Sequence, residues 1–224
     1  MPRRYRARLS AQALQSHRGW DPGALALARE LARAMRADLF YATTSRLLVE
    51  LNRSPGHPDA FAIRNLSSVE KADLLKTFYL PYRQRIEARI AEAVERGGRV
   101  IHVSCHSFTP RLQGVTRDAD IGLLFDPRRA LEVALCRTWA RALRGLRVRR
   151  NYPYKGTDDG LTTYLRGRFP PACYAGIEIE VNQKFPRGDP RRWRAVRGQL
   201  VRVICGVPHR DHIAVGSATR SRAQ

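Results

Sequence analysis

The hydrophobic positions of the chain recur with a helical period in some segments and alternate residue by residue in others. Residues 21–36 carry an apolar stripe at helical spacing, and Asp21 and Pro22 suit the N-cap and the first helical position. Pro81 falls inside a second periodic segment and predicts two helices or a kink there. The pattern predicts helices over residues 21–36, 67–96, 128–144 and 190–205.

Short apolar runs bounded by Gly, Pro, Asn and Ser predict strands between these helices. They cover residues 37–45, 46–51, 99–105, 119–126, 147–153 and 175–183. Strands that alternate with helices are typical of an α/β fold, here a three-layer sandwich with a mostly parallel or mixed central sheet. We expect one such domain over residues 1–206 and a flexible tail over residues 207–224.

Polar side chains lie at the carboxyl ends of three of these strands, where the active sites of open α/β sheets are found. In residues 175–183, Glu178 and Glu180 alternate with apolar side chains, so both carboxylates lie on one face of the strand. Carboxylates on a central strand are costly unless they are paired or hydrogen-bonded. We therefore expect both glutamates to belong to a site, and a water-facing edge strand is the alternative.

His106 stands at the end of a buried strand, in the stretch VSCHSFTP. Its neighbour Cys105 points to the opposite face of the strand, which argues against a cysteine–histidine nucleophilic pair. Metal ligation, general-base chemistry and a buried structural role all remain open for His106. Asn52 and Arg53 precede a loop rich in turn-forming residues, and an arginine beside an amide is suited to holding a carboxylate.

Charge is the strongest signal in the composition. The chain has 41 Lys and Arg residues against 20 Asp and Glu residues, and its formal net charge is +21. Such a charge attracts nucleic acid or another polyanion. The arginines are nevertheless spread over all the predicted helices, with few aromatic residues among them, unlike typical single-strand binders. Nucleic acid is therefore the weaker expectation for a partner.

Other features of the composition point to an ordinary cytoplasmic protein. No apolar run approaches the roughly 20 residues that a bilayer span requires, and the basic N-terminal segment lacks the apolar middle of a secretory signal. The four cysteines are widely separated and contain no Cys-x-x-Cys pair, which argues against a disulfide scaffold or a cysteine zinc cluster. We expect no membrane association, and the sequence gives no information on oligomeric state.

Seven stretches, in this order, together resemble the N-formylglutamate amidohydrolase family over essentially the whole chain. They are SHRGWDPGALALARELA, SRLLVELNRSP, LPYRQRI, HVSCHSFTP, RDADIGLLFDP, NYPYKG and IEIEVNQ. The resemblance implies a zinc carboxypeptidase-like fold and the hydrolysis of N-formylglutamate or a similar N-acylated acidic amino acid. It also implies that His106 is a zinc ligand, that Glu180 is the general base, and that Asn52 and Arg53 hold the carboxylate of the substrate.

The implied chemistry is metal-assisted. One zinc ion per chain would lower the pKa of a bound water to about 7, and Glu180 would pass the proton of that water to the leaving nitrogen. Supporting positions are Glu178, Arg117, His17 and Asp21, although capping a helix is the alternative role for Asp21. A small acidic amide is the partner that this reading predicts.

The chain departs from the family pattern in two ways. The family's first strand and its Cys-Glu-His-x-Gly-Asn ligand loop have no counterpart here, and we expect the natural protein to start upstream of Met1. Asn182 and Lys184 replace an Arg and an Asp of the family pattern, which leaves the acyl group and the substrate open. The alternative function is a catalytically inactive, basic binding protein on the same fold, which interacts with nucleic acid or another polyanion.

Overall fold

The computed structural model describes residues 1–206 and a strand at residues 212–217. A six-stranded sheet with the order β1-β8-β2-β7-β5-β6 forms its centre. These strands are β1 Asp38–Tyr41, β2 Val100–Phe108, β5 Ile121–Leu124, β6 Val148–Arg150, β7 Tyr174–Asn182 and β8 His212–Ser217. Within this sheet β5 and β7 pair antiparallel, and the other neighbouring strands pair parallel. The prediction of a mixed, mostly parallel sheet is confirmed.

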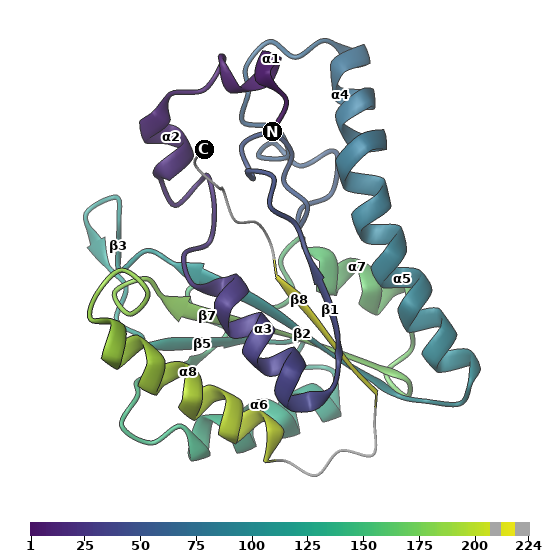
Figure 1. Cartoon of the computed structure of the whole chain (residues 1–224). Coiled ribbons are helices and arrows are strands. Elements are labelled where there is room, and N and C mark those ends of the chain that lie inside the picture. Colours follow the sequence, from purple (N-terminus) through teal and green to yellow (C-terminus); the bar gives the residue numbers. More distant parts are fainter. Residues whose placement is uncertain (207–211, 218–224) are drawn as a thin grey trace.

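Helices cover both faces of this sheet and give the three predicted layers. One face is covered by α3 Ala24–Met35, α6 Ala130–Ala142 and α8 Pro190–Cys205. The other face is covered by α5 Leu80–Glu95 and α7 Leu161–Arg168. Figure 1 shows the sheet close to edge-on, with α3, α6 and α8 below it and α7 above it.

The alternation of side chains along β2 sorts its residues between these two layers. Ile101, Val103 and Cys105 are fully buried in the core formed with α3, α6 and α8. His102 and His106 point to the opposite face, because successive side chains of a strand alternate. The predicted separation of Cys105 from His106 is therefore confirmed, and burial raises the pKa of the Cys105 thiol.

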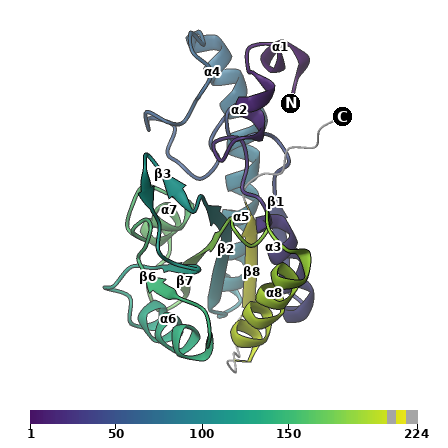
Figure 2. The ribbon, with the colours of Figure 1, turned by 90° about the vertical axis from the view of Figure 1, so that its left-hand side faces the viewer.

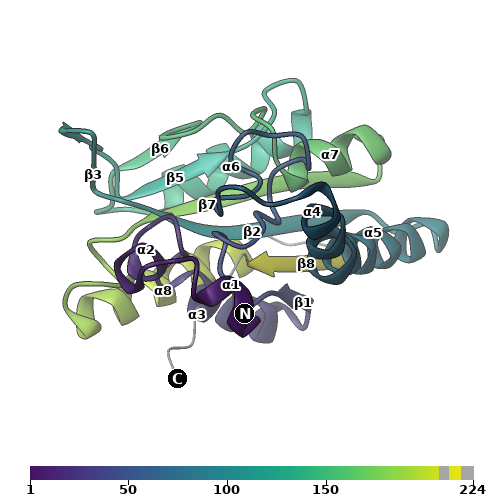
Figure 3. The same ribbon diagram turned by 90° about the horizontal axis from the view of Figure 1, so that it is seen from above.

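The remaining elements stand above the carboxyl ends of β2 and β7. They are α1 Arg3–Arg6, α2 Ala11–Gln15, α4 Ser68–Leu74, the π-helical turn η1 Leu75–Tyr79, and the hairpin of β3 Arg111–Leu112 and β4 Val115–Thr116. Figure 2 shows α1, α2 and α4 above the sheet. Viewed from above, α1, α2 and α4 lie over the strands and β3 lies beyond one end of the sheet (Figure 3).

The long helical segment begins where the sequence predicts, and a π turn separates α4 from α5 next to Pro81. Ser67 caps α4, because its hydroxyl accepts from the Glu70 amide at 3.1 Å and the Glu70 carboxylate accepts from the Ser67 amide at 2.8 Å. Pro81 lies in the first turn of α5, directly after η1. The wider π turn lies beside the proline, where the backbone lacks an amide hydrogen.

Three local predictions are wrong. Helix α3 begins at Ala24 with Gly23 as its N-cap, so Asp21 is not the cap. Residues 46–51 form turns instead of a strand, and their apolar run arises because Leu48 and Val49 are buried in two different side-chain clusters. Residues 212–217 are not a tail, because they form β8 between β1 and β2. The rest of the predicted tail, residues 207–211 and 218–224, lies outside the described residues.

Two further expectations concern the described part of the chain. No helix within it is long and apolar enough to span a membrane. All four cysteines are free, and Cys105 and Cys136 are buried.

Candidate active site

The pairing of β2 with β7 brings the predicted chemical residues together. His106 lies directly opposite Glu180 in this parallel pair, and Ser104 lies opposite Glu178. Side chains at directly opposite positions project to the same face of a sheet. The face that carries His106 therefore also carries Ser104 and both glutamates, at the carboxyl end of the strands.

His106 is held by hydrogen bonds at both ring nitrogens. Its Nδ1 lies 3.0 Å from Asp21 Oδ2, its Nε2 lies 3.0 Å from Ser104 Oγ, and Nε2 is 3.7 Å from Glu178 Oε2. Burial lowers the pKa of the imidazole, but the hydrogen bond to Asp21 and the neighbouring carboxylates together raise it to about 9. The ring is therefore a cation at neutral pH.

Glu180 is the least satisfied charged residue of this site. It is only 6% exposed, and its Oε2 is buried without a hydrogen-bond partner in the described part of the chain. Burial raises its pKa to about 8, with further increases from the charges of Asp21 and Glu178 and opposing effects from His106 and Arg46. A carboxylate kept unpaired in this way is a stronger base than an ordinary glutamate.

Arg46 holds two further carboxylates behind this pair. Its Nη1 donates to Asp21 Oδ1 and its Nε donates to Glu50 Oε2, both at 2.5 Å. Burial raises the pKa of Asp21, but the charge of Arg46 and the hydrogen bond to His106 outweigh this effect. The pKa of Asp21 is therefore lower than usual, and Asp21 stays ionised. Arg46 therefore keeps Asp21 as the anionic partner that orients His106.

Glu178 is tied to the far wall of the site through α7. Thr162 Oγ1 donates to Glu178 Oε1 at 2.5 Å, and the Asn52 side chain lies beside Gly160 at the start of the same helix. The Leu161 amide donates to Asn52 Oδ1 at 2.9 Å, so Asn52 caps α7. Asn52 thereby fixes the position of Thr162.

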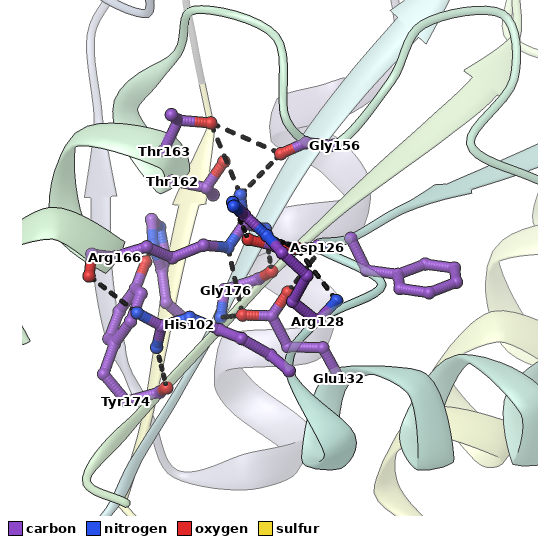
Figure 4. Close-up of polar contacts among 12 residues, drawn as sticks. His102, Asp126, Arg128, Glu132, Gly156, Thr162, Thr163, Arg166, Tyr174 and Gly176 are labelled. Carbon is purple, nitrogen blue, oxygen red and sulfur yellow. Dashed lines mark hydrogen bonds and ion pairs between the residues drawn. The ribbon is translucent and has the colours of Figure 1, made fainter. Parts of the chain in front are cut away.

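A buried ion pair anchors α7 from below (Figure 4). Arg166 Nε donates to Glu132 Oε1 at 3.0 Å, and the Gly176 amide donates to the same oxygen at 2.9 Å. Arg166 Nη2 donates to the Gly176 carbonyl at 2.6 Å. These side chains satisfy the Gly176 backbone, which lies beyond the residues of β7 that pair with β5.

His106, Glu178 and Glu180 form the floor of a cavity of about 430 Å³. Arg53, Arg117 and His17 line its walls. Arg53 Nη1 donates to the Asp159 carbonyl at 2.5 Å, and Arg117 Nη1 donates to the Tyr154 hydroxyl at 3.2 Å. Burial and the surrounding arginine charges lower the pKa of His17. The walls therefore combine these basic groups with the side chains of Asp59, Asp158 and Asp159, and the floor carries carboxylates.

All eight residues that the sequence singles out thus meet in one place. His106, Glu178 and Glu180 lie on the floor, Asp21 lies behind them, and the others surround them; this last group is Asn52, Arg53, Arg117 and His17. The chemical roles assigned to them stay predictions. Sequence reasoning missed Arg46, Ser104 and Thr162.

Two of these omissions had a signal in the sequence. Ser104 lies two residues before His106 on the same strand and must share its face. Arg46 lies four residues before Glu50, inside the stretch SRLLVELNRSP. The assumption that residues 46–51 form a strand concealed the spacing, because residues four apart do not make a side-chain pair along a strand as they do in a turn or helix.

The site does not by itself provide the ligands of a zinc centre. Among the described residues, no three His, Cys, Asp or Glu side chains are placed to hold one metal ion. His106 Nε2 faces Glu178, but Asp21 is already bonded to Arg46 and to the other ring nitrogen. A catalytic zinc needs about three protein ligands, so these side chains alone do not fit one.

Comparisons with known proteins identify the family and agree with the fold. The family model for N-formylglutamate amidohydrolase matches residues 1–185. A gene product of Agrobacterium tumefaciens is similar in structure, with a TM-score of 0.79 and 32% identity over 91% of this chain and 84% of that one. An N-formylglutamate amidohydrolase from Ralstonia eutropha has the same fold, with a TM-score of 0.57 and 19% identity over 83% and 81%. No curated protein matches.

Proposed function

Because the chain belongs to the N-formylglutamate amidohydrolase family, we propose that it hydrolyses N-formylglutamate or a similar N-acylated acidic amino acid in the cytoplasm. The family is one of amidohydrolases. The observation that carries the proposal is the Glu180 carboxylate, which is buried beside a cationic imidazole and has one oxygen without a partner among the described residues. Its raised pKa of about 8 suits a group that accepts and returns a proton near neutral pH.

The proposed reaction uses Glu180 as a general base and then as a general acid. Glu180 takes a proton from a water molecule as the water oxygen attacks the acyl carbon of the amide. The carbon–nitrogen bond then breaks, and Glu180 gives the proton to the leaving nitrogen, which releases the carboxylic acid and the amino acid. The positive charges of His106 and Arg46 beside the floor stabilise the negative charge that develops on the carbonyl oxygen.

The walls of the cavity support an acidic substrate. Arg53 and Arg117 line it, and neither guanidinium forms an ion pair with an acidic side chain among the described residues. A guanidinium binds a carboxylate through two parallel hydrogen bonds. The two carboxylates of an N-acylated glutamate would therefore bind at the walls and place the acyl group on the floor, near Glu180.

Zinc is proposed as a cofactor because the family resemblance implies it. His106 Nε2 would be one ligand, which requires the imidazole to lose the proton that makes it a cation in the absence of metal. The remaining ligands would have to come from outside the group of side chains gathered here. The measurement is the metal content of the purified protein. One zinc per chain that is lost in His106→Ala supports the proposal, and a protein that retains no zinc after dialysis but still hydrolyses the substrate contradicts it.

The activity test uses N-formyl-L-glutamate with zinc added and measures the release of glutamate. N-formyl-norvaline, which lacks the side-chain carboxylate, is the matched control substrate. We expect its kcat/KM to be lower by about 10- to 100-fold, because one charge-assisted contact is lost. A folded protein that releases no glutamate under these conditions would overturn the proposed function.

The second candidate is an inactive basic binding protein. The absence of a three-ligand metal group among the described residues and the net charge of +21 favour it. This function predicts binding of generic DNA that weakens steeply with salt, because phosphate contacts release counterions. A fluorescence titration with a DNA duplex at two salt concentrations distinguishes it from the enzyme.

A further inference from the structure

A second hollow of about 880 Å³ lies between α5 and α7, and it shares Asp159 with the wall of the active-site cavity but none of the floor residues. Its walls are largely apolar, and they include Leu80, Ala88, Ala91 and Phe169. Leu80 and Tyr164 line it and are 44% and 43% exposed, which makes them two of the large hydrophobic side chains that the described surface leaves open to solvent. An exposed apolar patch of this kind is typical of a binding surface.

A buried arginine lies in the wall of this hollow. Arg83 is only 6% exposed, and its Nε is buried without a hydrogen-bond partner in the described part of the chain. Its guanidinium carbon lies 4.9 Å from the centre of the Tyr79 ring and 4.6 Å from that of Tyr164. Its Nη1 donates to the Arg53 carbonyl at 3.1 Å and to the Tyr79 hydroxyl. The tyrosines and the carbonyl therefore fix the group in place.

No carboxylate neutralises this guanidinium among the residues that the structure describes. Burial lowers the pKa of Arg83 and the charges of the nearby acids Asp159 and Glu87 raise it, but neither acid forms an ion pair with Arg83. Asp159 accepts from the Ser54 amide and hydroxyl, both at 2.9 Å. Glu87 accepts from Arg168 and Tyr164, at 2.8 and 2.7 Å. Both acids are thus already occupied, and a buried cation without a counter-ion is costly.

We propose that this hollow is a second ligand site, which binds a small carboxylic acid with an apolar body. The carboxylate pairs with Arg83, and the apolar body lies along Leu80, Ala88 and Phe169. Arginine favours carboxylates because its planar edge matches their two oxygens. The proposal does not depend on the amidohydrolase activity, because none of these contacts involves the floor of the active site.

The test measures the binding of octanoate by calorimetry, with acetate and 1-octanol as matched ligands that lack the apolar body or the charge. Octanoate should bind about 10- to 100-fold more tightly than either. Arg83→Gln should weaken octanoate binding by a similar factor, whereas Arg85→Gln, an exposed arginine of the same helix, should leave it unchanged. Thermal unfolding of each variant verifies that it is folded.

Ala88→Trp provides an independent variant, since it fills the hollow from an exposed position on α5. It should abolish octanoate binding without changing glutamate release, which also separates this site from the basic walls of the active site. Octanol binding as tight as that of octanoate, unchanged binding in Arg83→Gln or Ala88→Trp, or no saturation of the folded protein below about 10 mM would each overturn the proposal.

Discussion

Two groups of buried charges lie along β7, and they differ in how completely their members are paired. At Gly176, both oxygens of Glu132 accept hydrogen bonds, and each guanidinium nitrogen of Arg166 donates one. At the carboxyl end of the same strand, Glu180 Oε2 has no partner among the described residues. Glu132 and Arg166 satisfy the backbone groups of Gly176, whereas the Glu180 carboxyl group faces a cavity without a hydrogen-bond partner for one of its oxygens.

The difference shows what each group contributes. Paired buried charges fix a fold because breaking one pair leaves an uncompensated charge. An unpaired buried carboxylate costs stability and persists where it serves chemistry. Two histidines of β2 show the same contrast, since His106 is held as a cation by Asp21, whereas burial and the charges of Arg166 and His106 lower the pKa of His102 to about 3.

Removing the unpaired carboxylate is expected to have the largest effect. Glu180→Gln should lower kcat for N-formylglutamate by about 10²- to 10⁴-fold, the usual contribution of a general base. Stability should stay the same near neutral pH, where the pKa of about 8 leaves Glu180 mostly protonated, and should increase above about pH 8, where a neutral amide replaces a costly buried charge. Steady-state kinetics and chemical denaturation measure both effects, and a kcat within about threefold of the unmodified protein would show that Glu180 is not the base.

Breaking the pair of Glu132 and Arg166 should instead lower the stability of the fold. Glu132→Ala leaves Arg166 buried without its anion and should lower the free energy of unfolding by about 3–5 kcal/mol. Glu92→Ala is the matched control, because this glutamate is exposed on α5 and its ion pairs with Arg89 and Arg96 lie at the surface, so it should change the free energy of unfolding far less. Equal losses in the two variants would contradict the assignment of Glu132 to the fold.

The contrast between the histidines predicts a dependence of stability on pH. The pKa of His102 is about 3 in the folded protein and about 6.5 in the unfolded chain, so below about pH 6.5 only the unfolded chain takes up this proton. Because of this difference, the free energy of unfolding does not depend on His102 above about pH 6.5. It falls by about 1.4 kcal/mol for each pH unit as the pH decreases from about 6.5 toward 3. His102→Gln should flatten this acid limb in denaturation experiments at pH 7 and pH 5, and an unchanged slope would refute it.

The smallest expected effect concerns the hydroxyl that connects the two groups. Thr162→Val removes the hydrogen bond to Glu178 and should lower the free energy of unfolding by about 1 kcal/mol. It should also lower kcat/KM, because Glu178 loses its fixed position beside His106. Thr163→Val is the control, since that hydroxyl bonds only backbone carbonyls and the side chain of Arg166. A kcat/KM that falls equally in both variants would count against this link.

Much of the fold was predictable because its signals are local. The alternation along residues 175–183 and the period of residues 190–205 identify β7 and α8, and α8 spans Pro190–Cys205 as expected. The position of β8 could not be predicted, because its pairing with β1 and β2 depends on residues that are distant in sequence. The cap of α3 was mispredicted because Asp21 makes long-range contacts to Arg46 and His106 that outweigh its local preference.

The candidate site was predictable to a similar degree. Strand alternation placed Glu178 and Glu180 on one face, and the order of the motifs brought His106 into the same hypothesis. The contacts of Arg46 with Asp21 and of Thr162 with Glu178 span 25 and 16 residues of sequence and have no local pattern, although the spacing of Arg46 from Glu50 does. The pairing of β2 with β7 is the step that turns separate motifs into one site.

The position of β8 between β1 and β2 has a consequence for the folding of the protein during synthesis. During synthesis β1 and β2 leave the ribosome well before residues 212–217, yet each needs β8 as a neighbour. Until those residues emerge, both strands expose unpaired edges, which are prone to associate with other chains. The sheet can therefore be completed only after translation has passed β8, and the nascent chain must be protected until then.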